Sequence, residues 1–135
     1  MKEQIISFDT AKLAKEKGIF NADTFSFYNK NGQFVLNPIY FADIEELKEE
    51  DLAKDHYLAH TQSLLQKILR EKYDIHILIE HVVEEITNKS LYEMTVIWDG
   101  FKDNTGIDYT GGTYEEALEE GLKEGLKLIN QDYEQ

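Results

Sequence analysis

Two histidines of this chain stand at a spacing that suits metal binding, because His56 and His60 are four residues apart. On a helix their side chains would share one face, as paired histidines do in many metal sites. However, the glutamate that follows the first histidine of metalloprotease helices is missing, and the sequence places no third ligand beside the pair. Packing or surface histidines are the favoured interpretation. His76 and His81 are an odd number of residues apart, so on one strand they would point to opposite faces.

A second candidate is an anion-binding site at the start of a predicted helix. Thr61 and Ser63 place hydroxyl groups where the free N–H groups of a helix N-terminus attract anions. Lys67 and Arg70 follow one and two turns later and could complete a site for phosphate or carboxylate. Helix capping by Thr61, with the basic residues on a solvated face, is the simpler alternative.

Signals for catalysis are missing from the sequence. Acidic residues are so numerous that some pair will lie close together in any fold, and none has the spacing of a general acid and base. A nucleophile elbow and a phosphate-binding glycine loop are also missing. The chain has no cysteine, which excludes disulfides, zinc–thiolate sites and thiol catalysis. We favour a protein without catalytic activity, cofactor or metal, and keep a metal-dependent hydrolase as an alternative.

A loop predicted between residues 99 and 113 mixes aromatic residues with acids and glycines. Exposed aromatic residues on loops often contact partners, which makes Trp98, Phe101 and Tyr109 candidate interaction residues. Folding back over the edge of the sheet is the favoured alternative for the same side chains.

The formal net charge of −13 over 135 residues argues against direct binding to nucleic acid, whose phosphates attract clustered lysine and arginine. Seven acidic and two basic residues fall in each of the segments 42–60 and 113–135. Solvated helix faces that aid solubility are the simplest explanation of these segments. No apolar run reaches the roughly 20 residues of a membrane span, and the N-terminal segment does not resemble a signal peptide. We expect a cytoplasmic protein that does not bind membranes.

The elements that position these candidates follow from hydrophobic periodicity. Apolar residues recur at helical spacing between residues 61 and 73, and isoleucines then alternate with other residues from Ile75 to Ile79. Only Tyr73 and Asp74 separate the two patterns, so we expect the helix to turn back tightly onto its own strand. Further helices are predicted over residues 7–18 (capped by Ser7 or Asp9, with Gly18 after its end) and 113–130, and one or two short helices, or partly an ordered loop, over residues 43–57. Further strands are predicted over residues 25–28, 33–38 and 91–101.

This order of elements predicts an α+β fold in a single domain that spans residues 1–135. The strands form two hairpins, which we expect to join in a four-stranded, mainly antiparallel sheet. Three to four helices would pack largely on one face of that sheet.

The last predicted helix carries small residues every four positions, at Ala117, Gly121 and Gly125. Each glycine costs a helix about 1 kcal/mol relative to alanine, so a close neighbour is expected along this stripe. Core packing, with Trp98 as the expected neighbour, is favoured over a helix–helix contact in a homo-oligomer.

Three segments, residues 6–18, 59–71 and 114–129, resemble segments of a family of small uncharacterised proteins from Bacteroidetes genomes and their phages. The family carries Pro and Trp where this chain has His60 and Ile68. The resemblance implies a phage or mobile-element accessory protein and brings no activity or catalytic residues.

Charge, missing motifs and resemblance together favour a non-enzymatic intracellular accessory protein that binds another protein through acidic surfaces. A homo-oligomer is possible on this view. The alternative is a protein that binds a small anionic ligand, a nucleotide or phosphometabolite, at Thr61, Ser63, Lys67 and Arg70.

Overall fold

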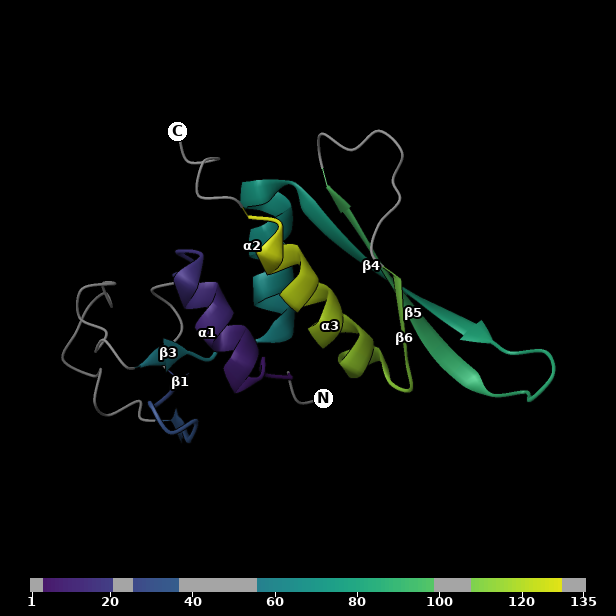
Figure 1. The fold of residues 1–135 in the computed structure, drawn as a ribbon, viewed down its shortest axis with the longest axis horizontal. Coiled ribbons are helices and arrows are strands. Elements are labelled where there is room, and N and C mark those ends of the chain that lie inside the picture. Colours follow the sequence, from purple (N-terminus) through teal and green to yellow (C-terminus); the bar gives the residue numbers. More distant parts are fainter. Residues whose placement is uncertain (1–3, 21–25, 37–55, 99–107, 130–135) are drawn as a thin grey trace. The chain divides into compact units, whose positions relative to one another are not determined.

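The computed structural model describes residues 4–20, 26–36, 56–98 and 108–129. Within these ranges the protein is α+β, with three helices and two three-stranded antiparallel sheets (Figure 1). The chain divides into two compact units. The single domain expected from the sequence stays a prediction. One unit comprises residues 5–61, and the other comprises residues 62–135 together with residues 1–4.

The first helix of the 5–61 unit, α1 (Phe8–Glu16), begins and ends where its capping residues predict. The backbone N–H of Thr10 donates to the Ser7 hydroxyl over 3.2 Å, which satisfies one of the free donors of the first turn. Gly18 follows the last turn with a φ of +79°, the left-handed conformation that ends many helices. The predicted helix is therefore confirmed.

The sheet of this unit contains β1 (Ser26–Tyr28), β2 (Phe34–Leu36) and β3 (Tyr57–Leu58), in the order β2-β1-β3. The predicted hairpin of β1 and β2 is confirmed, and the Asn29 carboxamide oxygen accepts the N–H groups of Asn31 and Gln33 in its turn. The acidic segment 43–57, expected to form one or two short helices or partly an ordered loop, ends instead in a strand, because Tyr57 lies in β3, which pairs with β1. Its remaining part lies outside the described residues.

His60 follows β3 and is a buried residue of this unit, with 1% of its surface exposed. Its backbone carbonyl accepts the N–H of Ile6 over 3.0 Å. Burial disfavours the charged imidazolium and lowers the pKa of His60 from 6.5 to about 4.

The 62–135 unit begins with α2 (Gln62–Tyr73), which is followed at once by β4 (Ile75–Val83). The reversal between them uses Asp74, whose φ of 55° lies in the left-handed region that aspartate tolerates better than most residues. The Gln66 side-chain amide then donates to the Ile77 carbonyl over 3.0 Å. These contacts confirm the prediction that the helix turns back onto its own strand.

β4 pairs with β5 (Ser90–Trp98), and β5 pairs with β6 (Asp108–Gly111), all antiparallel. The predicted single four-stranded sheet is wrong, because the two predicted hairpins lie in separate sheets, each completed by a strand that the sequence did not predict. β6 falls in the segment expected to be a loop. It has four residues and ends in glycine, so pairing with β5 rather than its own periodicity makes it a strand.

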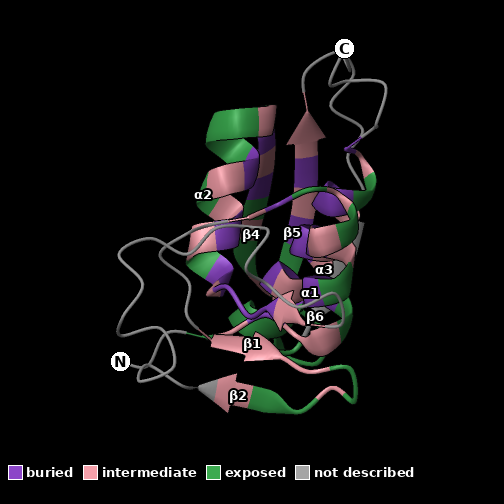
Figure 2. Ribbon diagram, turned by 90° about the vertical axis from the view of Figure 1, so that its left-hand side faces the viewer, coloured by how far each residue is buried: buried purple, intermediate pink, exposed green. Residues whose placement is uncertain are grey.

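Two helices, α2 and α3 (Tyr114–Lys127), pack against one face of the β4-β5-β6 sheet, which we call its helix-facing side. Buried residues gather between these helices and the strands (Figure 2). Thr113 caps α3 by accepting the N–H of Glu116 over 3.1 Å, as its capping box predicts. The small-residue stripe of α3 faces the sheet, where Gly121 and Gly125 are both buried. Core packing of the stripe is thus confirmed, although the atoms nearest these two glycines belong to residues other than Trp98.

The closest approach in this core predicts which glycine can be replaced. A Cβ atom added at Gly121 would lie 2.5 Å from Ile77 Cγ2 and 2.9 Å from Met94 Cγ, neither of which is the far end of a flexible side chain. We expect Gly121→Ala to lower the free energy of unfolding by about 1–3 kcal/mol through overpacking. At Gly125 the nearest atoms would be 3.2 Å away, and one of them is Leu69 Cδ1, the end of a flexible side chain.

Gly125→Ala is therefore the matched control. There, the gain of about 1 kcal/mol in helix propensity offsets the tighter contact, and stability stays within about 1 kcal/mol of the parent chain. Urea denaturation measures both variants. Equal stability of the two variants would contradict the packing given for Gly121.

The burial of His60 predicts a pH dependence of stability. Its folded pKa is below its unfolded value, so its contribution is complete above pH 6.5 and is lost as the pH falls towards about 4. Between about pH 7 and about pH 5.5 we expect a loss of about 1 kcal/mol from this residue. Urea denaturation at both pH values measures this loss. The control variant His76→Asn, which removes a more exposed histidine, should show the same loss between the two pH values. A His60 ring resonance that titrates near pH 6.5 would refute the assignment.

Candidate protein-binding surface

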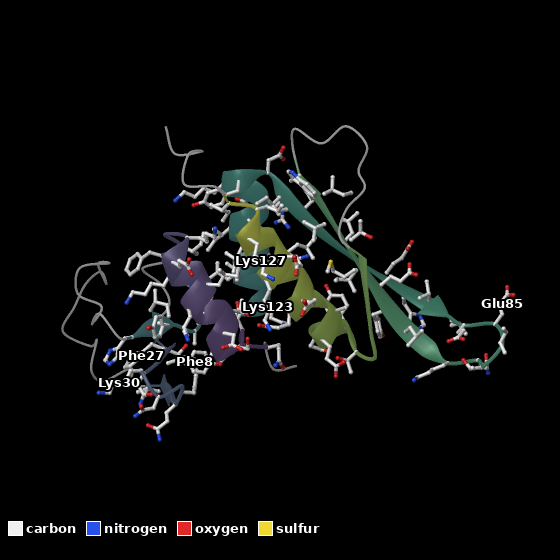
Figure 3. The ribbon with its side chains drawn as sticks, in the orientation of Figure 1. Phe8, Phe27, Lys30, Glu85, Lys123 and Lys127 are labelled. Carbon is white, nitrogen blue, oxygen red and sulfur yellow. The ribbon has the colours of Figure 1, made fainter. Side chains whose placement is uncertain are left out.

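Exposed apolar residues of the described segments concentrate on one hairpin, formed by β4 and β5. Leu78 is 51% exposed, Val83 is 53% exposed and Ile86, in the turn, is 93% exposed. The distal part of this hairpin extends past α2 and α3 (Figure 1), and Glu85 marks its tip in Figure 3. Large apolar side chains that folding leaves in solvent, gathered on one element, are typical of an interaction site.

The hairpin is built by a long, regular register. Nine consecutive pairs link the strands, from Ile75 opposite Trp98 to Val83 opposite Ser90. The turn between them is closed by the N–H of Glu84, which donates to the Lys89 carbonyl over 2.9 Å. Asn88 takes a φ of 58° in this turn, a conformation that asparagine adopts more readily than most residues.

An apolar and aromatic row runs along the helix-facing side of the distal hairpin. The His81 and Tyr92 rings lie 5.0 Å apart between centroids, and Tyr92 meets Tyr114 edge-on at 6.2 Å. His81 also hydrogen-bonds through its Nε2 atom to the Ser90 hydroxyl. We call this row, continued by the exposed residues at the end of the hairpin, the hairpin stripe; its members are Tyr114, Tyr92, His81, Val83 and Ile86.

Acidic residues are numerous on the distal hairpin: Glu84 and Glu85 lie in the turn next to the hairpin stripe, and Glu80 and Glu93 lie on the opposite face of the sheet. Glu80, Glu84, Glu85 and Glu93 are all exposed, and Lys89 is the one basic residue between positions 75 and 98. Glu80 lies directly opposite Glu93 in the register. Like charges in facing positions destabilise a hairpin by a few tenths of a kcal/mol up to about 1 kcal/mol. The arrangement therefore costs stability, as residues selected for binding often do.

The predicted anion site is an exposed helix face. Ser63, Lys67 and Arg70 are exposed on α2 at spacings that place them on one side. The Arg70 guanidinium lies 3.7 Å from the Glu71 carboxylate, with both side chains about half exposed. Thr61 precedes the helix, forms a single β-bridge with Ile5 and belongs to the 5–61 unit. Anion binding at these residues stays a prediction.

The predicted aromatic interaction residues are dispersed. Trp98 is half-buried at the end of β5, opposite Ile75. Tyr109 belongs to β6, where its Cα faces that of Met94. Phe101 lies outside the described residues. An interaction through these three residues stays a prediction.

The disfavoured alternative, in which His56 and His60 share one face of a helix as metal ligands, does not hold, because the two histidines flank β3. His56 stacks on the Phe27 ring at 4.6 Å, and His60 is buried, so packing is what the structure shows for both. Among the described residues, no group of three or more histidine and carboxylate side chains could hold a metal ion.

Sequence reasoning did not single out the hairpin stripe. A visible signal was Ile86, an isoleucine placed in a turn directly after Glu84 and Glu85. An apolar residue in an acidic turn has no core to enter, which makes exposure the natural outcome.

The facing pair Glu80 and Glu93 predicts a gain of stability on charge reversal. We expect Glu80→Lys to raise the free energy of unfolding by about 0.5–1 kcal/mol at low salt, with a smaller gain at high salt. Glu85→Lys changes the net charge by the same amount but leaves Glu80 facing Glu93. It should therefore raise the free energy of unfolding by less than Glu80→Lys does. Urea denaturation at two salt concentrations compares them. Equal gains would assign the effect to net charge alone.

Within the described part of the chain, the helices are too short or too polar to cross a membrane. No family model, curated protein or solved structure matches the chain.

Proposed function

We propose that this chain is a non-enzymatic accessory protein that acts by binding another protein through its acidic surface, with the β4–β5 hairpin as its docking element. The observation that carries the proposal is the hairpin stripe, an apolar and aromatic row that ends at exposed Val83 and Ile86, with the exposed glutamates Glu84 and Glu85 next to them in the turn. Ile86 at 93% exposure is its most accessible residue.

This composition suits an interface with a protein. Binding sites between proteins commonly combine aromatic and aliphatic residues at the centre with charged residues at the rim. Tyr92 and Tyr114 supply rigid aromatic area at the start of the distal hairpin, where they contact each other. Val83 and Ile86 supply aliphatic area further out.

The charge of the chain selects the partner. A net charge of −13 repels nucleic-acid phosphates and anionic lipid headgroups. The exposed glutamates of the hairpin attract a basic surface and would speed its association. We therefore propose a basic protein as the partner. A role in a phage or mobile element, which the family resemblance implies, is compatible with this proposal and rests on the resemblance alone.

Replacement of the hairpin's most exposed apolar residue tests the proposal. Proteins captured from source cells by the immobilised chain are identified, purified and titrated by calorimetry. We expect Ile86→Asn to weaken binding at least about tenfold, because an apolar anchor is lost while the turn can still form. Binding should also weaken as salt is raised.

Thr87→Asn is the matched control, since it changes an exposed neighbour in the same turn without removing apolar area. It should bind within about twofold of the parent chain, a difference of well under 1 kcal/mol. Binding that is indifferent both to Ile86→Asn and to salt would refute the proposal.

A further inference from the structure

The outer edge of β4 is a second feature of the hairpin, distinct from its side chains. The sheet order is β4-β5-β6, so β5 is the strand partner of β4 and the other edge of β4 has none in the described part of the chain. Such an edge presents backbone N–H and C=O groups that another strand can pair with.

Two hydrogen bonds identify which residues point outward. In an antiparallel strand, the N–H and C=O of one residue point to the same side, and successive residues alternate. Glu84 N–H donates across the hairpin to the Lys89 carbonyl, so even-numbered residues of β4 point towards β5. The Ile77 carbonyl accepts from Gln66 of α2, which agrees that odd-numbered residues point outward. The outward residues of the distal half are therefore Ile79, His81 and Val83.

The protection of this edge is uneven. α2 lies beside the first half of β4 (Figure 2), and Gln66 satisfies the Ile77 carbonyl there. The distal half extends past both helices of its unit (Figure 1). Natural edge strands are commonly blunted by lysine, proline or a bulge, but β4 contains neither residue and keeps an unbroken register with β5.

The side chains on either side of this edge define what would fit beside it. Glu80 and Glu93 face each other on the side of the sheet turned away from the helices. His81 and Val83 are on the opposite side, in the hairpin stripe. An added strand whose residues alternate between basic and β-branched would place its basic residues on the face of Glu80, with Glu93 one strand further on, and its apolar residues on the face of the stripe. A second copy of this chain would instead bring further glutamates to the same place.

We propose that the distal edge of β4 captures an extended segment of a basic protein by strand addition, with alternating basic and β-branched residues in that segment. This proposal rests on the proposed function and specifies its partner. The backbone groups of Ile79, His81 and Val83 supply the pairing, and Glu80, with the charge of Glu93 one strand further on, selects the basic residues.

A synthetic peptide tests this mode of binding. The probe is a seven-residue peptide of alternating lysine and valine, capped at both ends, titrated into the full chain. Val83→Pro removes an outward N–H while leaving the pairing with β5 intact, and proline is tolerated at such edge positions. Val83→Thr is the matched control, because it keeps both the N–H and the branched side chain. We expect Val83→Pro to weaken peptide binding at least tenfold and Val83→Thr to leave it within twofold.

Amide hydrogen exchange gives an independent measure. With the peptide bound, exchange at Ile79, His81 and Val83 should slow at least tenfold, whereas the inward N–H groups of the even-numbered residues should change little. Failure of the parent chain to bind the peptide, equal binding by the two Val83 variants, or protection only of even-numbered residues would each overturn strand addition. If the captured protein still loses affinity with Ile86→Asn while the peptide does not bind, the proposed function stands and strand addition does not.

Discussion

The close contact between α3 and the β4-β5-β6 sheet is the constraint on which the 62–135 unit depends. Gly121 allows the helix backbone to approach Ile77 and Met94 at distances that a side chain would prevent. Because α3 lies this near, Leu118, Leu122 and Leu126 reach the core and are at most 3% exposed. Burial of such side chains supplies most of the free energy that stabilises a small sheet. The cost of glycine in a helix is thus offset by contacts that only glycine permits.

The same contact decides where the sheet is supported and where it is not. The two helices pack on the half of the hairpin that contains Ile75, Ile77, Met94 and Val96, all of them buried. Beyond this half, the strands continue in unbroken register to Val83 and Ser90, past the ends of both helices except for Tyr114 at the start of α3, which contacts Tyr92. The distal hairpin is consequently held by cross-strand pairing and by the contacts among His81, Tyr92 and Tyr114. A surface with exposed apolar residues on a supported base is well suited to contact a partner.

Much of this architecture could be predicted from local sequence patterns, because the responsible signals are local. The change from helical to alternating spacing at Asp74 predicted α2 and β4. The capping residues Ser7 and Thr113 predicted where α1 and α3 begin. The predictions that failed concern strands and sheets that depend on contacts between segments distant in the sequence. β3 has two residues and β6 has four, which is too short for periodicity to appear, and each is a strand because it pairs with a neighbour. Which hairpins share a sheet is equally non-local, so the single four-stranded sheet was a reasonable but wrong expectation.

The candidate surface was harder to predict than the fold, for a related reason. An alternating pattern shows which side chains share a face but not how far the covering helices extend along it. Val83 and Ile79 have the same pattern in the sequence, yet Val83 is 53% exposed because it lies beyond the helices. His56 and His60 show the converse, since their helical spacing is accidental and β3 separates them.

The open margin of β4 also bears on the colloidal behaviour of the protein. Nine residues rich in isoleucine and valine, without a protective lysine or proline, resemble the segments from which ordered aggregates grow. Mutual repulsion between molecules that each carry a net charge of −13 keeps such margins apart at neutral pH. The surplus of glutamate and aspartate therefore has a second role, as a barrier against self-association by a chain that leaves a strand unfinished. Acidification or high salt weakens this electrostatic repulsion, and the unpaired edge of β4 is where aggregation of the folded protein would begin.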